Sequence, residues 1–296
     1  MRLGVTLGLA VVSATLFAQA TVTVYSQNNP PGDLFTNPTN VNLGYNFGHP
    51  NWRYNNTRGS GQVGIRTNYP RSGNGSVYFR TPSSAAKADI EYFVDPLNVG
   101  GNFLPNPINP NSIMGTLQQL THLSYEWYRD SSSTVNSWLH PVLRLGIVRV
   151  NSDNTTAVGY LIFERAYNQG TVPVPTDQWV ADDIIANNYK LWATAQLGFG
   201  DPNDDINQVL KTIPEWIATA NAAGATLYIV SVNAGVGSGW FGSGPPHVFT
   251  GAVDNIRFGF NGQYTTYNFE VVPEPASMLA LGSGLVSLLA LRRRRA

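Results

Sequence analysis

The chain has 296 residues, of which 43% are hydrophobic, 11% aromatic and only 12% charged, with 29 glycines and 19 prolines. This length suits one large domain or two small ones, and the low charge favours a β-rich extracellular protein over a helical cytosolic enzyme. There is no cysteine, which excludes disulfides, thiolate nucleophiles and Cys-ligated zinc sites.

The first twenty residues have the pattern of a secretory signal peptide. Arg2 provides a positive start, residues 3–17 form an apolar stretch, and Ala18-Gln19-Ala20 is a small-x-small cleavage site. We therefore expect residues 1–20 to be removed, with Ala18 and Ala20 as the cleavage residues and Thr21 as the first mature residue.

Residues 21–271 are expected to form a single domain. Short runs rich in Val, Ile, Tyr and Phe recur between turn residues, at 75–81, 88–94, 122–129, 141–150, 157–166, 225–236, 252–260 and 265–271. Such spacing predicts a mainly β fold, an antiparallel β-sandwich of the jelly-roll type found in lectins and carbohydrate-binding modules. The Pro- and Asn-rich stretch 100–112 is expected to be a surface loop.

One segment, residues 203–220, predicts a short helix instead. Apolar residues recur at helical spacing after an Asn/Asp start: Ile206, Val209 or Leu210, Ile213 and Ile217. Pro214 is expected to kink or split this helix, because proline lacks the N–H that the helix interior needs.

The strand 252–260 carries an acidic residue that alternation places among apolar ones. Asp254 shares a face with Ile256 and Phe258 if the strand is regular, and a buried carboxylate needs hydrogen-bond donors or a cation. The stretch "GAVDNIRFGF" resembles the final strand of carbohydrate-binding jelly rolls, and "SGNGSVYF" (72–79) resembles an early one. This resemblance implies a structural calcium ion at Asp254, and plain hydrogen bonding in a turn is the alternative.

No catalytic constellation stands out, and we expect a protein that is not an enzyme and has no catalytic residue. Asp89 and Glu91 share a strand face without a third acid, and Glu126 and Glu164 stand alone among aromatic residues. The four histidines lack metal-site spacing, and no Gly-x-Ser-x-Gly motif is present.

All seven tryptophans lie in the expected domain, and two of them are the candidate ligand-binding residues. Trp127 and Trp192 stand in strand-like runs and are expected in the core, and Trp216 is expected to pack the short helix. Trp52 and Trp240, in loop-like surroundings, are the pair predicted to be exposed and to stack on sugar rings.

The C-terminal residues 272–296 form a second targeting segment. Residues 276–291 are apolar but short of the roughly 20 residues that span a bilayer, and four arginines follow, which would stay on the cytoplasmic side. The order Val-Pro-Glu-Pro, short apolar helix and arginine cluster closely resembles the PEP-CTERM sorting signal of exported bacterial proteins. In that family an exosortase recognises and cleaves the segment, which implies recognition roles for Pro273, Glu274 and Pro275. It also implies a stop-transfer role for the terminal cluster Arg292, Arg293, Arg294 and Arg295.

The two targeting segments conceal the charge of the domain between them. They contain five of the 18 basic residues and one of the 18 acidic residues, which leaves 13 basic and 17 acidic residues. A mildly acidic domain lacks the clustered Lys and Arg that nucleic acid binding requires, so no nucleic acid partner is expected.

The sequence thus predicts an exported protein that is inserted in the inner membrane during sorting and then lies at the cell surface or outside the cell. The leading hypothesis for its function is a non-catalytic surface or matrix protein that binds extracellular polysaccharide. The alternative is a secreted glycoside hydrolase or polysaccharide lyase.

Overall fold

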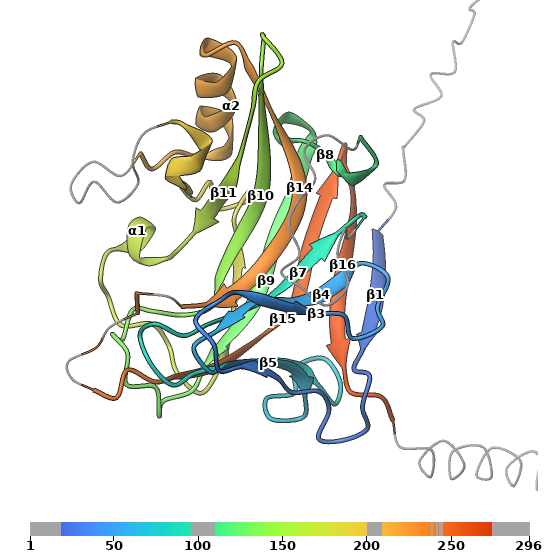
Figure 1. Cartoon of the computed structure of the whole chain (residues 1–296), viewed down its shortest axis with the longest axis vertical. Helices are drawn as coiled ribbons and strands as arrows, with labels where there is room; N and C mark the ends of the chain where they lie inside the picture. The colour runs from blue at the N-terminus through green and yellow to red at the C-terminus, as the bar shows by residue number, and fades with distance from the viewer. Residues whose placement is uncertain are drawn as a thin grey trace, which may run out of the picture.

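The described part of the chain is a two-layered β-sandwich (Figure 1). The computed structural model describes residues 19–95, 110–199, 209–237, 239–240, 242 and 245–273. Within these residues the strands form two eight-stranded sheets. The apolar faces of both sheets form one core cluster, which confirms the predicted mainly β sandwich.

The first sheet, sheet A, is organised around one long strand, β15. β9 pairs along nearly all of one side of β15, whereas β6 and β16 share the other side. Its strands are antiparallel except for β1, which pairs in parallel with β16. The members of sheet A are β1 (Gln19–Tyr25), β2 (Phe35–Asn37), β5 (Gly61–Arg66), β6 (Ser76–Thr81), β9 (Leu120–Arg129), β12 (Trp179–Asp183), β15 (Phe249–Phe260) and β16 (Gln263–Glu270).

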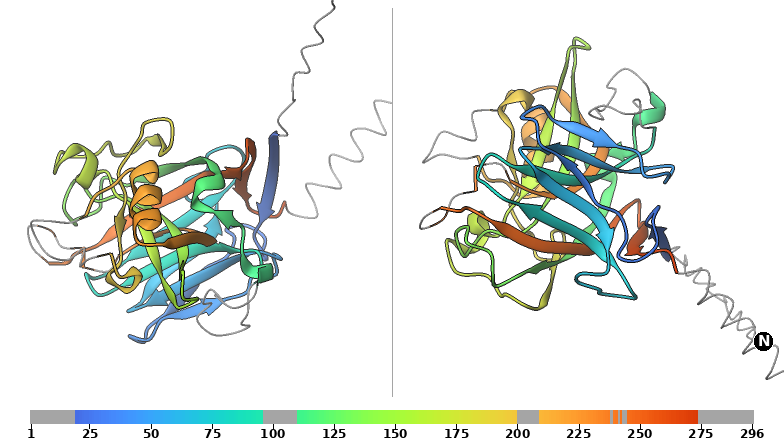
Figure 2. Two further views of the ribbon diagram at one scale, coloured as in Figure 1. Left: turned by 90° about the horizontal axis from the view of Figure 1, so that it is seen from above. Right: turned by 60° about the horizontal axis from the view of Figure 1, so that its bottom comes forward.

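The second sheet, sheet B, follows the order β13-β11-β10-β14-β7-β4-β3, with β8 paired to β14. One face of sheet B packs on sheet A, and its outer face points away from sheet A. Figure 2 shows the two layers from two further directions. Its members are β3 (Leu43–Tyr45), β4 (Trp52–Arg58), β7 (Lys87–Phe93), β8 (Gly115–Thr116), β10 (Val142–Asn151), β11 (Thr156–Phe163), β13 (Trp192–Ala193) and β14 (Ala225–Val236).

All eight strands that alternation predicts are confirmed, because each matches a strand within a few residues. Eight further strands occur in the described residues. β2, β3, β8 and β13 have only two or three residues, too few to show a pattern, whereas β1, β4, β5 and β12 have five to seven residues and were not predicted. In the 100–112 stretch, only its end is described, as the 3₁₀ turn Pro110–Ser112. Two further 3₁₀ turns span Leu117–Gln119 and Ala195–Leu197.

The predicted helix is present but shorter than expected. Helix α2 spans Ile213–Ala222, and the four-residue α1 spans Ala166–Gln169. Pro214 stands in the first turn of α2, where a missing N–H costs nothing, so it begins the helix and does not kink it. Thr212 caps this end with Glu215 in a capping box. Of the predicted range, residues 203–208 lie outside the described residues.

A β-bulge in β15 corrects the predicted position of Asp254. The register with β9 shifts between Asp254 and Arg257, and Asn255 has a left-handed φ of 48°. The bulge exchanges the two faces of the strand, so that Ile256 lies on the core face and Asp254 does not. Asp254 is opposite Glu126, on the outer face of sheet A.

Candidate functional site

The outer face of sheet B carries a polar cluster in which every second residue of neighbouring strands is polar. β7 contributes Lys87, Asp89 and Glu91, and the adjacent β14 contributes Ser231 and Asn233. The residues between them point to the core. Four of these side chains are fully buried, and Lys87 is the exception. The strands on either side of this pair complete the cluster. β4 contributes Asn55 and Asn56 on one side, and β10 and β11 contribute Arg144 and Tyr160 on the other.

Asp89 is held by four donors. Its Oδ1 accepts a hydrogen bond from Arg144 Nη1 at 2.9 Å. Its Oδ2 accepts from the amides of Asn56 at 3.1 Å and Asn233 at 3.2 Å, and Lys87 Nζ lies 3.3 Å away. Burial alone would favour the neutral acid, but the Arg144 and Lys87 charges outweigh it and lower the pKa of Asp89.

Glu91 is equally saturated, by neutral donors. Its Oε1 accepts from Ser231 Oγ at 2.6 Å and from the Tyr160 hydroxyl at 3.2 Å. Its Oε2 accepts from Asn55 Nδ2 at 2.8 Å and Asn233 Nδ2 at 3.2 Å. Burial raises the pKa of Glu91 despite these hydrogen bonds, and the neighbouring Asp89 charge adds to this effect.

Local backbone features make room for this cluster. A register shift in β4 after Asn55, with Asn56 at a φ of 49°, lets two consecutive asparagines serve the same face. Gly235 and Gly146 leave the necessary space. A Cβ on Gly235 would lie 1.9 Å from Asp89 Oδ1, and one on Gly146 would lie 2.0 Å from Ser231 Oγ.

The chemistry of this cluster is that of a brace between strands. A carboxylate has about four lone-pair positions, and both acids already accept four donors. Neither carboxylate can act as a general base or as a nucleophile toward a substrate without first losing some of its hydrogen-bond donors. The acid pair that the sequence reveals on β7 is therefore occupied in holding five strands together.

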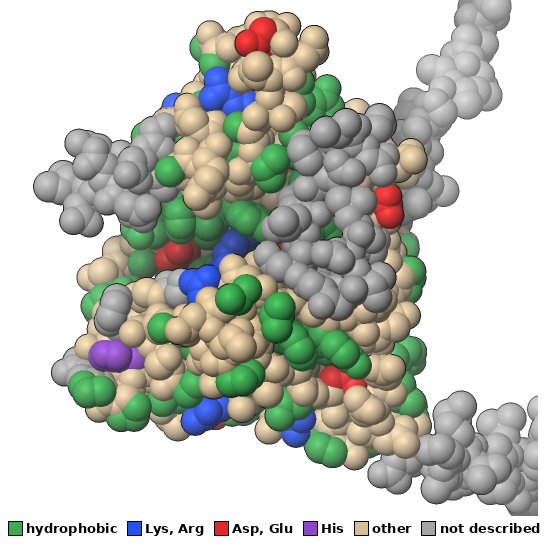
Figure 3. All heavy atoms as spheres, viewed as in Figure 1, with side chains coloured by type: hydrophobic (Ala, Val, Ile, Leu, Met, Phe, Trp, Pro, Cys, Tyr) green, Lys and Arg blue, Asp and Glu red, His purple; other side chains and the backbone are tan. Residues whose placement is uncertain are grey.

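Glu164 differs from these two acids. It follows β11 and is half-buried beside Arg144 and the Trp192 indole. Burial raises its pKa to about 7, against the opposing effect of the Arg144 charge and the indole. Trp192, expected in the core, is half-buried on this outer face. Figure 3 shows a hollow over sheet B, with basic and acidic side chains visible in it.

Both tryptophans predicted to bind ligand are buried, so their predicted exposure is wrong. Trp52 is 0% exposed and packs edge-on against Tyr92, Tyr267 and Phe269 between the sheets. Trp240 is 7% exposed and packs edge-on against Phe249. The apolar area of an indole favours the core even when the neighbouring sequence looks like a loop. Trp127 and Trp216 are buried as expected.

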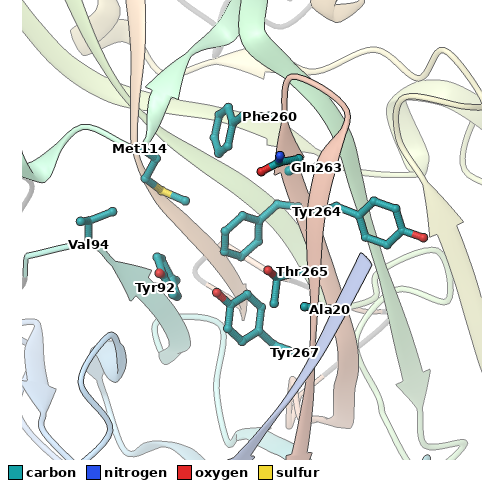
Figure 4. A pocket seen from close by; sticks show the side chains of 11 residues that line it. Ala20, Tyr92, Val94, Met114, Phe260, Gln263, Tyr264, Thr265 and Tyr267 are labelled. Atoms are coloured by element: carbon teal, nitrogen blue, oxygen red, sulfur yellow. The ribbon is translucent and has the colours of Figure 1, made fainter. Parts of the chain in front are cut away.

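An aromatic cavity lies at one end of the sandwich, between β15–β16 and the end of β7 (Figure 4). It has a volume of about 380 Å³. In the part of the chain that the structure describes, its wall contains three tyrosines and two phenylalanines and no Asp, Glu, Lys, Arg or His. The lining residues are Ala20, Tyr92, Val94, Met114, Phe258, Gly259, Phe260, Gln263, Tyr264, Thr265 and Tyr267.

The rings in this cavity are held by one another. Phe258 and Tyr267 stack with centroids 5.1 Å apart, and Tyr92 meets Phe258 edge-on at 5.1 Å. Met114, Phe260 and Gln263 lie along its upper side in Figure 4. The only signal in the sequence is that aromatic residues stand at the ends of several strands, and the sequence does not tell which ends meet.

Asp254 is fully buried, as predicted, but by a different cause. The loop 71–75 covers the outer face of sheet A there, with Asn255 Nδ2 bonded to Ser72 Oγ at 2.8 Å. Burial raises the pKa of Asp254 to about 7, and the charges of Glu270 and Glu126 add to this effect. Asp254 Oδ2 has no hydrogen-bond partner among the described residues. An unpaired carboxylate oxygen is the kind of ligand that calcium takes, and calcium is the ion that the resemblance implies at this residue. No group of three or more His, Cys, Asp or Glu side chains is placed for a metal ion within the described ranges.

The remaining predicted site residues belong to the targeting segments. Ala20 is in β1, and Pro273 is the last described residue of the chain. Ala18, Glu274, Pro275 and the arginines Arg292, Arg293, Arg294 and Arg295 lie outside the described residues. In the part of the chain that is described, no helix is long and apolar enough to cross a membrane.

Comparison with known proteins identifies the C-terminal segment. Residues 271–295 match the PEP-CTERM protein-sorting motif. The chain is therefore an exported protein of the exosortase-sorted class, inserted in the membrane through its C-terminal segment during sorting and then placed at the surface or outside the cell. No curated protein matches the chain.

One solved structure resembles the domain weakly. It is described as "Structural basis for the promiscuous specificity of the carbohydrate-binding modules from the beta-sandwich super family". The TM-score is 0.28 at 12% sequence identity, with 79% of this chain and 63% of that chain covered. The match thus spans less than two thirds of that structure, and at this TM-score it carries no argument about function.

Proposed function

We propose that this exported protein is a non-catalytic binder of extracellular polysaccharide, and that the aromatic cavity at the end of the sandwich holds the sugar. The observation that carries the proposal is a concave site of about 380 Å³ whose wall combines aromatic rings with neutral hydrogen-bonding groups. Ligand sites are generally concave, largely apolar and marked by a few placed polar groups.

The chemistry of the wall favours a neutral sugar. Sugar rings have apolar C–H faces that pack on aromatic side chains, and Tyr92, Phe260 and Tyr267 supply such rings. The sugar hydroxyls need donors and acceptors, which the phenols, the Gln263 amide and the Thr265 hydroxyl supply. Among the described residues no charged side chain lines the cavity, which disfavours a phosphate or another strongly charged ligand.

The processing that we expect at the N-terminus would enlarge this site. Ala20 of β1 forms part of the wall, beside Thr265 of β16. Cleavage after Ala20 would remove that residue and open the cavity on the side of β1. The other ten lining residues belong to the expected mature domain.

Affinity electrophoresis of the full chain, in mild detergent, against a panel of neutral and acidic polysaccharides tests this proposal. We expect retardation by at least one neutral polysaccharide. The Phe260→Ala variant, which loses a half-buried ring, should weaken binding at least ten-fold, and Tyr92→Phe, which loses only a hydroxyl, should weaken it less. Tyr25→Ala removes a 49% exposed ring outside the cavity and serves as the matched control. No retardation by any glycan, or equal loss in the control, would rule the site out.

A second candidate function, hydrolysis of a glycosidic bond, is favoured by one observation. Glu164 follows β11 beside Arg144, and burial raises its pKa to about 7, which suits a general acid near neutral pH. Glycoside hydrolysis also needs a second carboxylate, and the nearby Asp89 and Glu91 are saturated by donors. Release of reducing sugar that disappears in Glu164→Gln would support this function, and no release from the same panel would remove it.

A further inference from the structure

Three oxygen atoms on the outer face of sheet A are buried without a hydrogen-bond partner among the described residues. They are Asp254 Oδ2, Asn268 Oδ1 and Glu270 Oε1. Asp254 is 0% and Glu270 7% exposed, so bulk water does not solvate their carboxylates. A buried polar atom without a partner is costly, and three in one region indicate that a group is needed to pair with them.

The two carboxylates are fixed in place by their other oxygens. Asp254 Oδ1 accepts the backbone N–H groups of Asn255 at 2.8 Å and Phe269 at 2.9 Å. Glu270 Oε2 accepts those of Asn74 at 2.5 Å and Gly75 at 2.8 Å. Each carboxylate is therefore held through one oxygen, while its other oxygen has no hydrogen-bond partner among the described residues.

The covering loop is built to approach these oxygens closely. A Cβ on Gly73 would lie 2.4 Å from Glu270 Oε1, and one on Gly75 would lie 2.9 Å from the Glu270 Cα. On the opposite side of Asp254, Glu126 is already paired with Arg71 at 2.7 Å and with the Asn255 amide at 2.8 Å. Within the described residues, no Lys, Arg or His side chain forms an ion pair with Asp254 or Glu270.

We propose that Asp254, Asn268 and Glu270 bind a divalent cation, Ca²⁺, between β15, β16 and the loop 71–75. The donor set consists only of oxygens, which suits a hard cation and disfavours zinc or copper. Two carboxylates balance the charge of the ion, and Asn268 adds a neutral amide oxygen. Ca²⁺ takes six to eight oxygen ligands and accepts backbone carbonyls and water for the remainder.

This site would lie directly before the first residue of the sorting motif. The motif begins at residue 271, directly after Glu270. Asn74 of the same loop holds Val271 through two hydrogen bonds of 3.0 Å, to its N–H and its C=O. Ser26 Oγ accepts the N–H of Val272 at 3.0 Å. A cation that joins Glu270 to the loop would thus fix the point at which the sorting motif leaves the domain.

Calorimetric titration of the detergent-solubilised full chain with Ca²⁺, after treatment with a chelator, tests this proposal. We expect one bound ion per chain and an unfolding midpoint several degrees higher in Ca²⁺ than in chelator. Asp254→Asn and Glu270→Gln should each weaken binding at least ten-fold. Asp153→Asn changes an exposed acid in the turn between β10 and β11 and should bind as the wild type does.

The competing occupants of this space are a proton shared by the two acids, or a water molecule. In that case the wild-type chain binds no Ca²⁺ and its midpoint is the same in Ca²⁺ and in chelator, which overturns the proposal. Binding that survives in Glu270→Gln also overturns it, because the ion then lies elsewhere. If Asp254→Asn does not fold, terbium luminescence of the wild-type chain and of Glu270→Gln replaces it, because this signal reports directly on an occupied calcium site.

Discussion

Arg144 Nη1 lies 2.9 Å from Asp89 Oδ1, and the two side chains are only 8% and 0% exposed. The same guanidinium nitrogen also donates to Asn233 Oδ1 at 2.7 Å. An ion pair of similar length joins Arg71 to Glu126 at 2.7 Å, but there the side chains are 41% and 21% exposed. The two pairs have the same chemistry in different environments, which makes their energetic contributions separable.

The first prediction compares these two pairs. Asp89→Asn leaves the Arg144 charge buried without its counter-charge and should lower the free energy of unfolding by about 3–5 kcal/mol. Arg71→Gln removes a solvent-screened pair and should lower it by less than about 1 kcal/mol. Urea denaturation of both variants measures the difference. Equal small losses would mean that the polar cluster of sheet B does not brace the strands.

The strands and the acid pair could be predicted from sequence because their signal is local. β14 has the predicted bounds, residues 225–236. The prediction succeeded because alternation, β-branched content and bounding turn residues all indicate the same strand. The alternation of β7 likewise places Asp89 and Glu91 on one face. That Asn233 joins both acids depends on which strands pair, which the local pattern does not contain.

The prediction from sequence was wrong where a single residue changes the register between two strands. Regular alternation places Asp254 with Ile256, but the bulge at Asn255 separates them. The burial of Trp52 and Trp240 shows a second limit. Glycines and prolines near a tryptophan describe the backbone around it, whereas its burial depends on strands that are distant in sequence.

A second prediction concerns the pH dependence of stability at Glu164. The folded pKa of about 7 lies above the ordinary value of 4.5, so the folded state binds more protons than the unfolded chain between these values. The free energy of unfolding should therefore fall as the pH rises from 4.5 to about 7, by up to about 3 kcal/mol, and then remain level. Glu164→Gln should remove this fall and be more stable than wild type at pH 8 but not at pH 4. Parallel curves for both proteins would contradict it.

A third prediction concerns His140, for which the sign is opposite. His140 stacks on Trp127 at 4.4 Å, and its Nε2 accepts the N–H of Arg165 at 3.2 Å, which requires the neutral ring. Burial lowers its pKa from 6.5 to about 3, so only the unfolded chain gains a proton between these values. The free energy of unfolding should fall as the pH drops through this window, by about 1.4 kcal/mol per pH unit.

His140→Gln tests this assignment. The variant should be less stable than wild type at pH 7, because it loses the stacked ring, but its stability should decline less steeply between pH 6 and pH 4. Denaturation midpoints measured at half-unit intervals of pH give both slopes. An unchanged slope would show that another group causes the loss of stability in acid.

A fourth prediction tests whether Gly235 is required by the cluster itself. A Cβ at this position would lie 1.9 Å from Asp89 Oδ1 and 2.8 Å from the backbone oxygen of Ala88, so Gly235→Ala must displace the Asp89 side chain from Arg144. Alanine restricts the unfolded chain and alone would add about 0.4–1 kcal/mol of stability, but the clash should reverse this and cost about 1–3 kcal/mol net. Because the clash is mainly with the Asp89 side chain, the substitution should cost at least about 1 kcal/mol less in an Asp89→Ala background. A double-mutant cycle by urea denaturation measures this coupling, and additivity within about 0.5 kcal/mol would show that Gly235 serves the strand pairing with β7 and not the carboxylate.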